Sequence, residues 1–149
     1  MNTKYQSSCF CGAVKLQLTG SPEAMAYCHC DSCRHWAAGP VSAFTLWKPD
    51  AVEVTQGQDC IDAFDKNSSQ NNGAVLSNRK WCKSCGGHIF TDHPTMGLID
   101  VPAVVIENFS FAPSFHVHYQ ETVLPIKDGL PKFRDLPKEA GGSGEQLAE

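Results

Sequence analysis

The stretch that decides the fold is Cys82-Lys83-Ser84-Cys85-Gly86-Gly87, a C-x-x-C turn followed by two glycines. Such a turn can place two sulfurs on one metal ion while its backbone N–H groups point at them. A glycine after the second cysteine allows the positive φ with which the turn ends. Two sulfurs are only half of the four ligands of a tetrahedral zinc site, so the turn requires a second pair from elsewhere in the chain.

Two further cysteine groups lie earlier in the chain. The first is Cys9-Phe10-Cys11-Gly12, and the second is Cys28-His29-Cys30-Asp31-Ser32-Cys33, whereas Cys60 stands alone. We pair the first group with the C-x-x-C turn and predict a structural zinc on four thiolates: Cys9, Cys11, Cys82 and Cys85. Closing such a site contributes on the order of 10 kcal/mol to folding.

The middle group offers three sulfurs within a short stretch, from Cys28, Cys30 and Cys33. A zinc ion held by three side chains keeps one coordination position for water or substrate, which is typical of catalytic sites. The alternative is a closed site in which a histidine is the fourth ligand. Four histidines are candidates for that position: His29, His35, His88 and His93. The spacing leaves the open and the closed site as equal alternatives.

The amount of cysteine also bears on the redox compartment. Eight of the 149 residues are cysteine, which is well above ordinary usage. A chain of this length buries roughly two-thirds of its unfolded surface, so it does not need disulfides to fold. Residues 1–8 contain no hydrophobic core of a secretory signal. We therefore expect a reducing cytoplasm and metal binding, with disulfides as the alternative.

Charge and hydropathy exclude two classes of partner. The chain has 12 Lys and Arg against 16 Asp and Glu, a formal net charge of −4. This acidic balance argues against nucleic acid, because neutralising phosphates requires clustered cations. No apolar run approaches the ~20 residues that span a bilayer, so we expect no membrane partner. The sequence predicts no particular oligomeric state.

The hydrophobic pattern predicts short β-strands. Apolar residues alternate with polar ones in several stretches, and nine prolines disfavour long helices. Strands are expected at residues 14–19, 41–47, 52–55, 61–64, 74–76, 101–106 and 115–119. Residues 65–73 resemble a long hairpin loop ending in Asn-Gly. A short helical turn is expected through Cys33–Trp36, capped by Asp31 or Ser32. We expect one all-β domain over residues 1–136 and a flexible tail over residues 137–149.

The cysteine groups and their neighbours resemble the glutathione-dependent formaldehyde-activating enzyme (GFA) family, also called the centromere-protein-V-like domain. Three motifs carry the resemblance: Ser8-Cys9-Phe10-Cys11-Gly12-Ala13-Val14, Cys28-His29-Cys30-Asp31-Ser32-Cys33-Arg34 and Trp81-Cys82-Lys83-Ser84-Cys85-Gly86-Gly87-His88-Ile89-Phe90. The segment 113–143 looks like the C-terminal region of one branch of the family, so the resemblance covers roughly residues 4–143.

The resemblance implies more than the spacing does. It implies an all-β, Mss4-like fold of small antiparallel sheets with zinc-binding cysteine turns. By matching position it implies a structural zinc on Cys9, Cys11, Cys82 and Cys85, and a labile catalytic zinc with an open position on Cys28, Cys30 and Cys33. The implied activity is that of a carbon–sulfur lyase acting on S-(hydroxymethyl)glutathione. Its partners would be a thiol such as glutathione and an aldehyde such as formaldehyde.

Several residues outside the cysteine groups are candidates for further roles. Glutathione has two carboxylates, and Arg34, which directly follows the middle group, is the first candidate to bind one, before Lys48, Arg79 and Lys80. Each of these could instead be a solvated surface charge. His116 and His118 are two apart on an expected strand, so we expect them on one face, most simply the solvated one. Cys60 is most simply a small buried hydrophobe.

Two other functions compete with the lyase. One is a zinc-stabilised binding module without catalysis, since the fold also serves as an interaction platform. The other is a thiol oxidoreductase, because methionine-R-sulfoxide reductases resemble this fold. Those reductases have two C-x-x-C pairs and a separate catalytic cysteine, whereas here the first pair is C-x-C and only Cys60 is left over. The oxidoreductase therefore ranks last.

Overall fold

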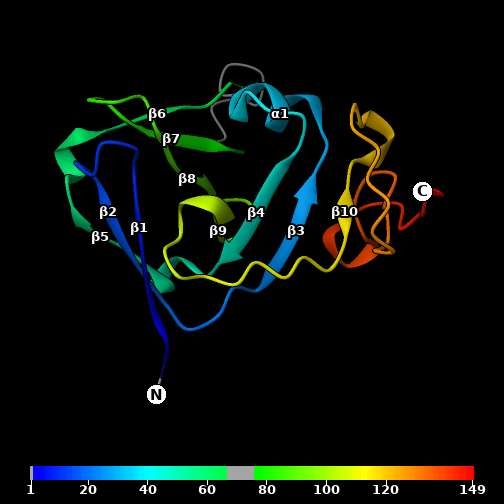
Figure 1. Ribbon diagram of the computed structural model, residues 1–149, viewed down its shortest axis with the longest axis horizontal. Helices are drawn as coiled ribbons and strands as arrows, with labels where there is room; N and C mark the ends of the chain where they lie inside the picture. The colour runs from blue at the N-terminus through cyan, green and yellow to red at the C-terminus, as the bar shows by residue number, and fades with distance from the viewer. Residues whose placement is uncertain (1, 67–75) are drawn as a thin grey trace. The chain divides into compact units, whose positions relative to one another are not determined.

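Short β-strands form most of the first of two structural units (Figure 1). The computed structural model describes residues 2–66 and 76–149. Their contacts separate a first unit, Met1–Glu23 with Thr45–Ser110, from a second unit, Ala24–Phe44 with Phe111–Glu149. Strand β4 (Ser42–Trp47) runs along the chain from the second unit into the first.

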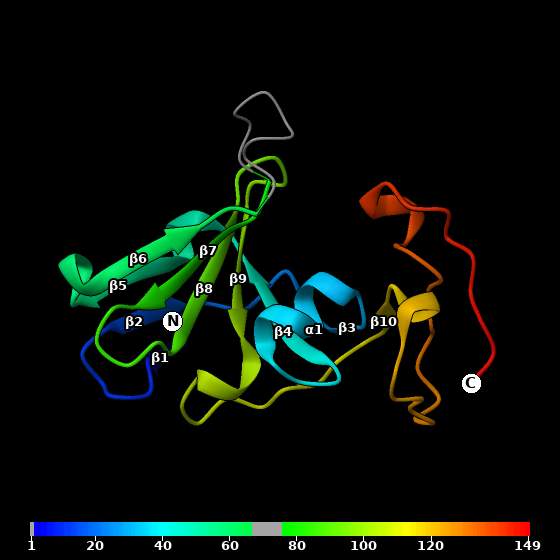
Figure 2. The ribbon, with the colours of Figure 1, turned by 90° about the horizontal axis from the view of Figure 1, so that it is seen from above.

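The first unit contains two runs of antiparallel strands. One has the order β1-β2-β5 and is built from β1 (Lys4–Ser8), β2 (Lys15–Thr19) and β5 (Val52–Gln56). In the other, each strand pairs with the next, as Figure 2 shows: β6 (Ile61–Phe64), β7 (Asn78–Cys82), β8 (His88–His93) and β9 (Leu98–Pro102). Three short 3-10 helices accompany them: η1 (Pro49–Ala51), η2 (Gln58–Cys60) and η3 (Ala103–Val105).

Two apolar clusters form the core of the first unit. The strict alternation in β2 directs Leu16 and Leu18 inward, and both are fully buried. Leu16 belongs to a cluster that also contains two cysteines, and its buried members are Cys9, Val14, Leu16, Cys82 and Ile89. The other cluster consists of Leu18, Trp47, Ile99, Val101 and Ile106. The first cluster places two predicted metal ligands inside the core.

The second unit has fewer regular elements. β3 (Ala24–Cys28) pairs in parallel with β10 (His116–Val117). The helix α1 (Asp31–Ala37) follows β3, and two 3-10 helices, η4 (Tyr119–Glu121) and η5 (Lys138–Ala140), lie in the C-terminal part. Rings fill much of its interior, since Tyr27 stacks on His116 with 4.9 Å between ring centroids and Phe115 meets Phe133 edge to face.

The all-β fold with cysteine turns is confirmed, and so are most of the strands expected in the first half of the chain. The expected strands at residues 14–19, 41–47, 52–55 and 61–64 correspond to β2, β4, β5 and β6, each to within one residue at either end. The pairing of β3 with β10 is parallel, unlike the antiparallel pairs of the first unit. Most of the expected loop 65–73 and most of the expected strand 74–76 lie outside the described residues.

Three local predictions were wrong. The run 101–106 is a strand only to Pro102, after which η3 begins, because a proline has no N–H to continue a ladder. Of residues 115–119, only His116 and Val117 form a strand. The cap of α1 is the sulfur of Cys30, which accepts a hydrogen bond from the backbone N–H of Cys33 at 3.3 Å, rather than Asp31 or Ser32.

The segment after residue 136 makes backbone hydrogen bonds to the segment before it. The N–H of Leu147 donates to the carbonyl of Lys132 at 2.8 Å, and the N–H of Arg134 donates to the carbonyl of Glu145 at 2.8 Å. The single domain, its boundary at 136 and a flexible tail stay predictions. None of the helices in the described residues is both long and apolar enough to cross a membrane.

Candidate metal centres

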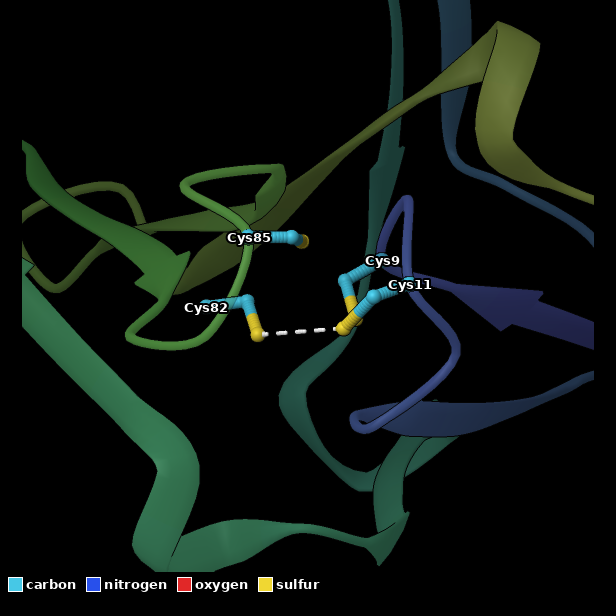
Figure 3. A group of neighbouring side chains, drawn as sticks. All are labelled: Cys9, Cys11, Cys82 and Cys85. Atoms are coloured by element: carbon cyan, nitrogen blue, oxygen red, sulfur yellow. Dashed lines mark hydrogen bonds between the residues drawn. The ribbon is translucent and has the colours of Figure 1, made fainter.

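Four cysteines from two distant segments of the first unit lie close together, and we call them the four-cysteine group: Cys9, Cys11, Cys82 and Cys85. Figure 3 shows one pair on the turn between β1 and β2 and the other on the turn between β7 and β8. All four sulfurs lie within 4.8 Å of one another. The sulfurs of Cys9 and Cys11 are 3.7 Å apart, and those of Cys11 and Cys82 are 3.9 Å apart. A tetrahedron with Zn–S bonds of ~2.3 Å has sulfur–sulfur edges of about 3.8 Å, so the group fits a zinc ion.

Glycines and backbone N–H groups shape both turns of the four-cysteine group. Gly12 and Gly86 have φ values of 81° and 73°, as expected for a glycine after a cysteine pair. The N–H of Val14 points at the sulfur of Cys9, and the N–H of Gly87 at that of Cys85, both at 3.3 Å. Donation from the backbone N–H groups of Cys11 and Gly87 lowers the pKa of Cys85 to about 6, which favours the thiolate that a metal needs.

Gly87 provides the closest approach between the two turns. A Cβ atom at this position would lie 2.9 Å from the backbone nitrogen of Phe10 and 3.1 Å from the sulfur of Cys85. We expect Gly87→Ala to separate the turns, to destabilise the first unit by about 1–3 kcal/mol and to weaken binding of its metal. Thermal unfolding and metal titration measure both effects. Gly39→Ala is the control, because its Cβ would meet only ordinary contacts at 3.8 Å and beyond; equal behaviour of both variants would contradict the prediction.

A second group of cysteines, which we call the three-cysteine group, lies where β3 passes into α1. Cys28 ends β3, Cys30 caps the helix and Cys33 lies in its first turn, and the three sulfurs lie within 4.8 Å of one another. The thiols of Cys28 and Cys33 donate to the sulfur of Cys30 and lower its pKa to about 2, whereas the pKa of Cys28 is raised. The three sulfurs thus share protons, and a divalent cation could replace those protons.

His29 lies between two members of the three-cysteine group but is not available as a metal ligand. Its ring is fully buried. Its Nε2 lies 2.9 Å from Nδ1 of His116, and its Nδ1 lies 2.8 Å from the hydroxyl of Thr122. Burial, followed by the charge of His116, lowers the pKa of His29 to about 4, so the ring is neutral. Within the described part of the chain, the group consists of these three cysteines.

The prediction that His116 and His118 share a solvated face was wrong. His116 is fully buried in β10, where its Nε2 hydrogen-bonds to the carboxylate of Asp128 at 2.8 Å. His118 lies beyond the strand in a left-handed conformation with φ of 53°, and it is partly exposed beside Glu121. The strand ends before His118, so side-chain alternation does not apply to it and the two rings do not share a face.

Sequence reasoning also missed the partners of His116. Asp128 accepts a hydrogen bond from the ammonium of Lys132 at 2.5 Å, and Lys132 is almost completely buried. Only the aromatic and histidine-rich character of residues 115–119 marked this region in the sequence. Nothing in the spacing of Asp128, Lys132 and Thr122 along the chain indicates that they meet His29 and His116.

The candidate substrate-binding cations have different surroundings. Arg34 donates from Nε to the carbonyl of His29 at 2.8 Å and lies 3.7 Å from the carboxylate of Asp31. It also lines an open hollow of about 460 Å³ beside α1, with Asp31, His35, Ala38, Gly39, Pro40 and Val123. Lys48 is exposed, Arg79 is buried in β7 and Lys80 is half-buried there. Of these cations, Arg34 is next to the three-cysteine group in the sequence.

Cys60 packs against the core cluster that contains Cys9 and Cys82, as expected for a small hydrophobe, but it is only partly buried. It is half-buried at the end of η2, and its sulfur lies 3.8 Å from that of Cys82 and 3.1 Å from the hydroxyl of Ser84. It nevertheless does not belong to the four-cysteine group, whose members all lie within 4.8 Å of one another.

Comparisons with known proteins agree with this arrangement. An uncharacterized lyase of Schizosaccharomyces pombe is 24% identical over 87 residues, which cover 58% of this chain and 56% of the relative. The chain therefore spans little more than half the length of that curated relative. The crystal structure of a Rhodobacter sphaeroides protein matches with a TM-score of 0.53 at 15% identity, over 70% of this chain and 90% of that one. This likeness concerns the fold alone.

A family comparison covers most of the chain. The family model of the glutathione-dependent formaldehyde-activating enzyme (GFA) matches residues 4–121, a range that contains both cysteine groups. The resemblance noted beyond residue 121 is not part of this match and stays a prediction. With both cysteine groups assembled and most of the chain matched, the protein belongs to the GFA family.

Proposed function

We propose that the chain is a zinc-dependent carbon–sulfur lyase of the GFA type, acting on S-(hydroxymethyl)glutathione or a related thiol–aldehyde adduct. In this proposal the four-cysteine group holds a structural zinc and the three-cysteine group holds a labile catalytic zinc. The observation that carries it is the three-cysteine group itself, which gathers three sulfurs while the neighbouring His29 has both ring nitrogens engaged. Sets of thiolates favour zinc among the common divalent ions.

The reaction requires little acid–base chemistry. Cleaving S-(hydroxymethyl)glutathione breaks the C–S bond while the hydroxyl loses its proton and becomes the carbonyl of formaldehyde, and the sulfur takes up a proton to give the thiol. When bound, zinc supplies positive charge that favours a thiolate over a thiol. Cys28, Cys30 and Cys33 would hold it, and the buried His29 ring leaves the fourth position to the substrate. The partners would be glutathione and an aldehyde in a reducing compartment such as the cytoplasm, without nucleic acid or membrane.

The decisive experiment compares rates with the uncatalysed reaction, because formaldehyde and thiols combine unaided. Formation of S-(hydroxymethyl)glutathione is measured with the zinc-loaded protein and with Cys33→Ser, and bound zinc is counted in both. We expect two zinc ions and a rate above the uncatalysed one for the wild type, and one zinc ion and the uncatalysed rate for Cys33→Ser. Cys60→Ser is the matched control and should behave as the wild type. Equal rates in all samples would favour a binding module without catalysis.

We further propose that Arg34 binds a substrate carboxylate. It lines the hollow beside α1 and follows Cys33 directly. We expect Arg34→Ala to weaken glutathione binding roughly tenfold and to reduce its salt dependence, because a charge-assisted contact is lost. The binding isotherm is measured by calorimetry at two salt concentrations.

A second variant separates this role from the hydrogen bond that Arg34 donates to His29. Arg34→Lys keeps the charge but not the planar guanidinium, so we expect it to retain the salt dependence. If Arg34→Ala left both the affinity and its salt dependence unchanged, Arg34 would not bind the substrate.

A further inference from the structure

We propose that His29 is a positioning residue, held by a hydrogen-bond chain through Thr122, His116, Asp128 and Lys132, that fixes Cys28 and Cys30 in the geometry that binds the second metal. We call these five residues the histidine relay. The inference rests on the proposed metal in the three-cysteine group and goes beyond it, since the relay supplies none of the sulfurs.

Residue 29 is anchored through all four of its polar groups. Its backbone N–H donates to the carbonyl of Val117 at 3.1 Å, and its carbonyl accepts from Nε of Arg34 at 2.8 Å. Its ring nitrogens meet His116 at 2.9 Å and Thr122 at 2.8 Å. The residue between Cys28 and Cys30 therefore cannot rotate without breaking several buried hydrogen bonds.

The relay continues from His29 to the charged pair of Asp128 and Lys132. Nε2 of His116 lies 2.8 Å from one carboxylate oxygen of Asp128, and the other oxygen accepts from Lys132 at 2.5 Å. Lys132 also donates to the carbonyl of Leu130 at 3.0 Å and to the carboxylate of Glu149 at 2.9 Å. Because a carboxylate only accepts, His116 donates from Nε2 to Asp128, and its Nδ1 is left to meet Nε2 of His29 at 2.9 Å. Each ring thus has one defined orientation.

The position of His29 explains how its fixed orientation can hold the metal ligands in place. The two ring nitrogens of His29 are turned to His116 and Thr122, whereas the sulfurs of its neighbours Cys28 and Cys30 lie within 4.8 Å of each other and of the sulfur of Cys33. Arg34, which clamps the carbonyl of His29, lies in the same helix as Cys33. His29 therefore connects all three cysteines. A site that is ordered before the metal binds has a higher metal affinity than one that must become ordered on binding.

The test measures metal affinity rather than turnover. Zinc is titrated against a chromophoric chelator into the metal-free full chain, and bound Co²⁺ provides a visible spectrum of the thiolate site. His29→Leu removes both ring hydrogen bonds, and Thr122→Val removes one of them with little change in shape. We expect the dissociation constant of the second metal to rise roughly 10–100-fold in His29→Leu and several-fold in Thr122→Val. The first metal, in the four-cysteine group, should bind unchanged in both.

Asp135→Asn is the matched control. Asp135 lies in the same unit and accepts from the backbone of Leu136 and from the backbone and hydroxyl of Ser143, but it makes no contact with the relay. We expect it to lower stability without changing either metal affinity.

The possible results of the zinc titration distinguish the inference on His29 from the proposed function. Unchanged affinity for the second metal in Thr122→Val and in a folded His29→Leu would overturn the inference and leave the proposed function standing. If His29→Leu did not fold, Thr122→Val alone would decide. A wild-type chain that binds a single metal would overturn the inference together with the proposed second site.

Discussion

Cys82→Ser should lose one bound metal per chain and the cooperative unfolding of the first unit. Cys82 is fully buried in a core cluster with Cys9, Val14, Leu16 and Ile89, so its thiolate is both a ligand and part of the core. A structural thiolate site contributes on the order of 10 kcal/mol to folding. That equals the whole net stability of a typical domain, which is about 5–15 kcal/mol. Metal analysis and thermal unfolding followed by near-UV circular dichroism measure the two losses.

Cys60→Ser is the natural control for this prediction. The sulfur of Cys60 lies only 3.8 Å from that of Cys82, yet Cys60 is outside the four-cysteine group. We expect this variant to keep both metals and to lose less than about 1 kcal/mol, as is usual away from buried or metal-binding positions. A Cys82→Ser protein that kept its metal and its melting temperature would contradict the assignment. Loss of metal from Cys60→Ser would instead make Cys60 a ligand.

Lys132→Ala should destabilise the second unit by about 2–5 kcal/mol, because it removes a fully buried side chain together with its hydrogen bonds to Asp128, Leu130 and Glu149. The side chain of Lys132 is 0% exposed and lies between the carboxylates of Asp128 and Glu149. Its ammonium and the ring of His116 hold the pKa of Asp128 well below its usual range, although burial opposes them. Amide hydrogen exchange of residues 116–119 measures the local stability.

Two variants check the cause of this loss. Lys127→Ala removes an exposed lysine from the same unit and should change little. Combining Lys132→Ala with Asp128→Ala should cost less than the sum of the single changes, because the two residues interact directly. Additive effects, or an equal loss in Lys127→Ala, would show that Lys132 does not act through its ion pair with Asp128.

The histidines show where prediction from the sequence failed. His29 and His116 are 87 residues apart and meet at 2.9 Å, and a further segment contributes Asp128 and Lys132. No local pattern predicts such a contact, since polar residues make a buried network only once the chain has folded. The wrong prediction for His116 has the same origin, because a strand of two residues is too short for alternation to decide which face is solvated.

The cysteine spacing by itself determined the two cysteine groups and the glycine-terminated turns, and the alternation of apolar residues with the nine prolines indicated the all-β class. These properties are local, because the distance between two sulfurs within C-x-C or C-x-x-C depends on a few dihedral angles. Only the tertiary structure decided which histidine is excluded from the metal, that Arg34 also clamps the carbonyl of His29, and that Cys60 lies beside Cys82. Each of these depends on contacts between distant segments, whose geometry is set by packing rather than by spacing along the chain.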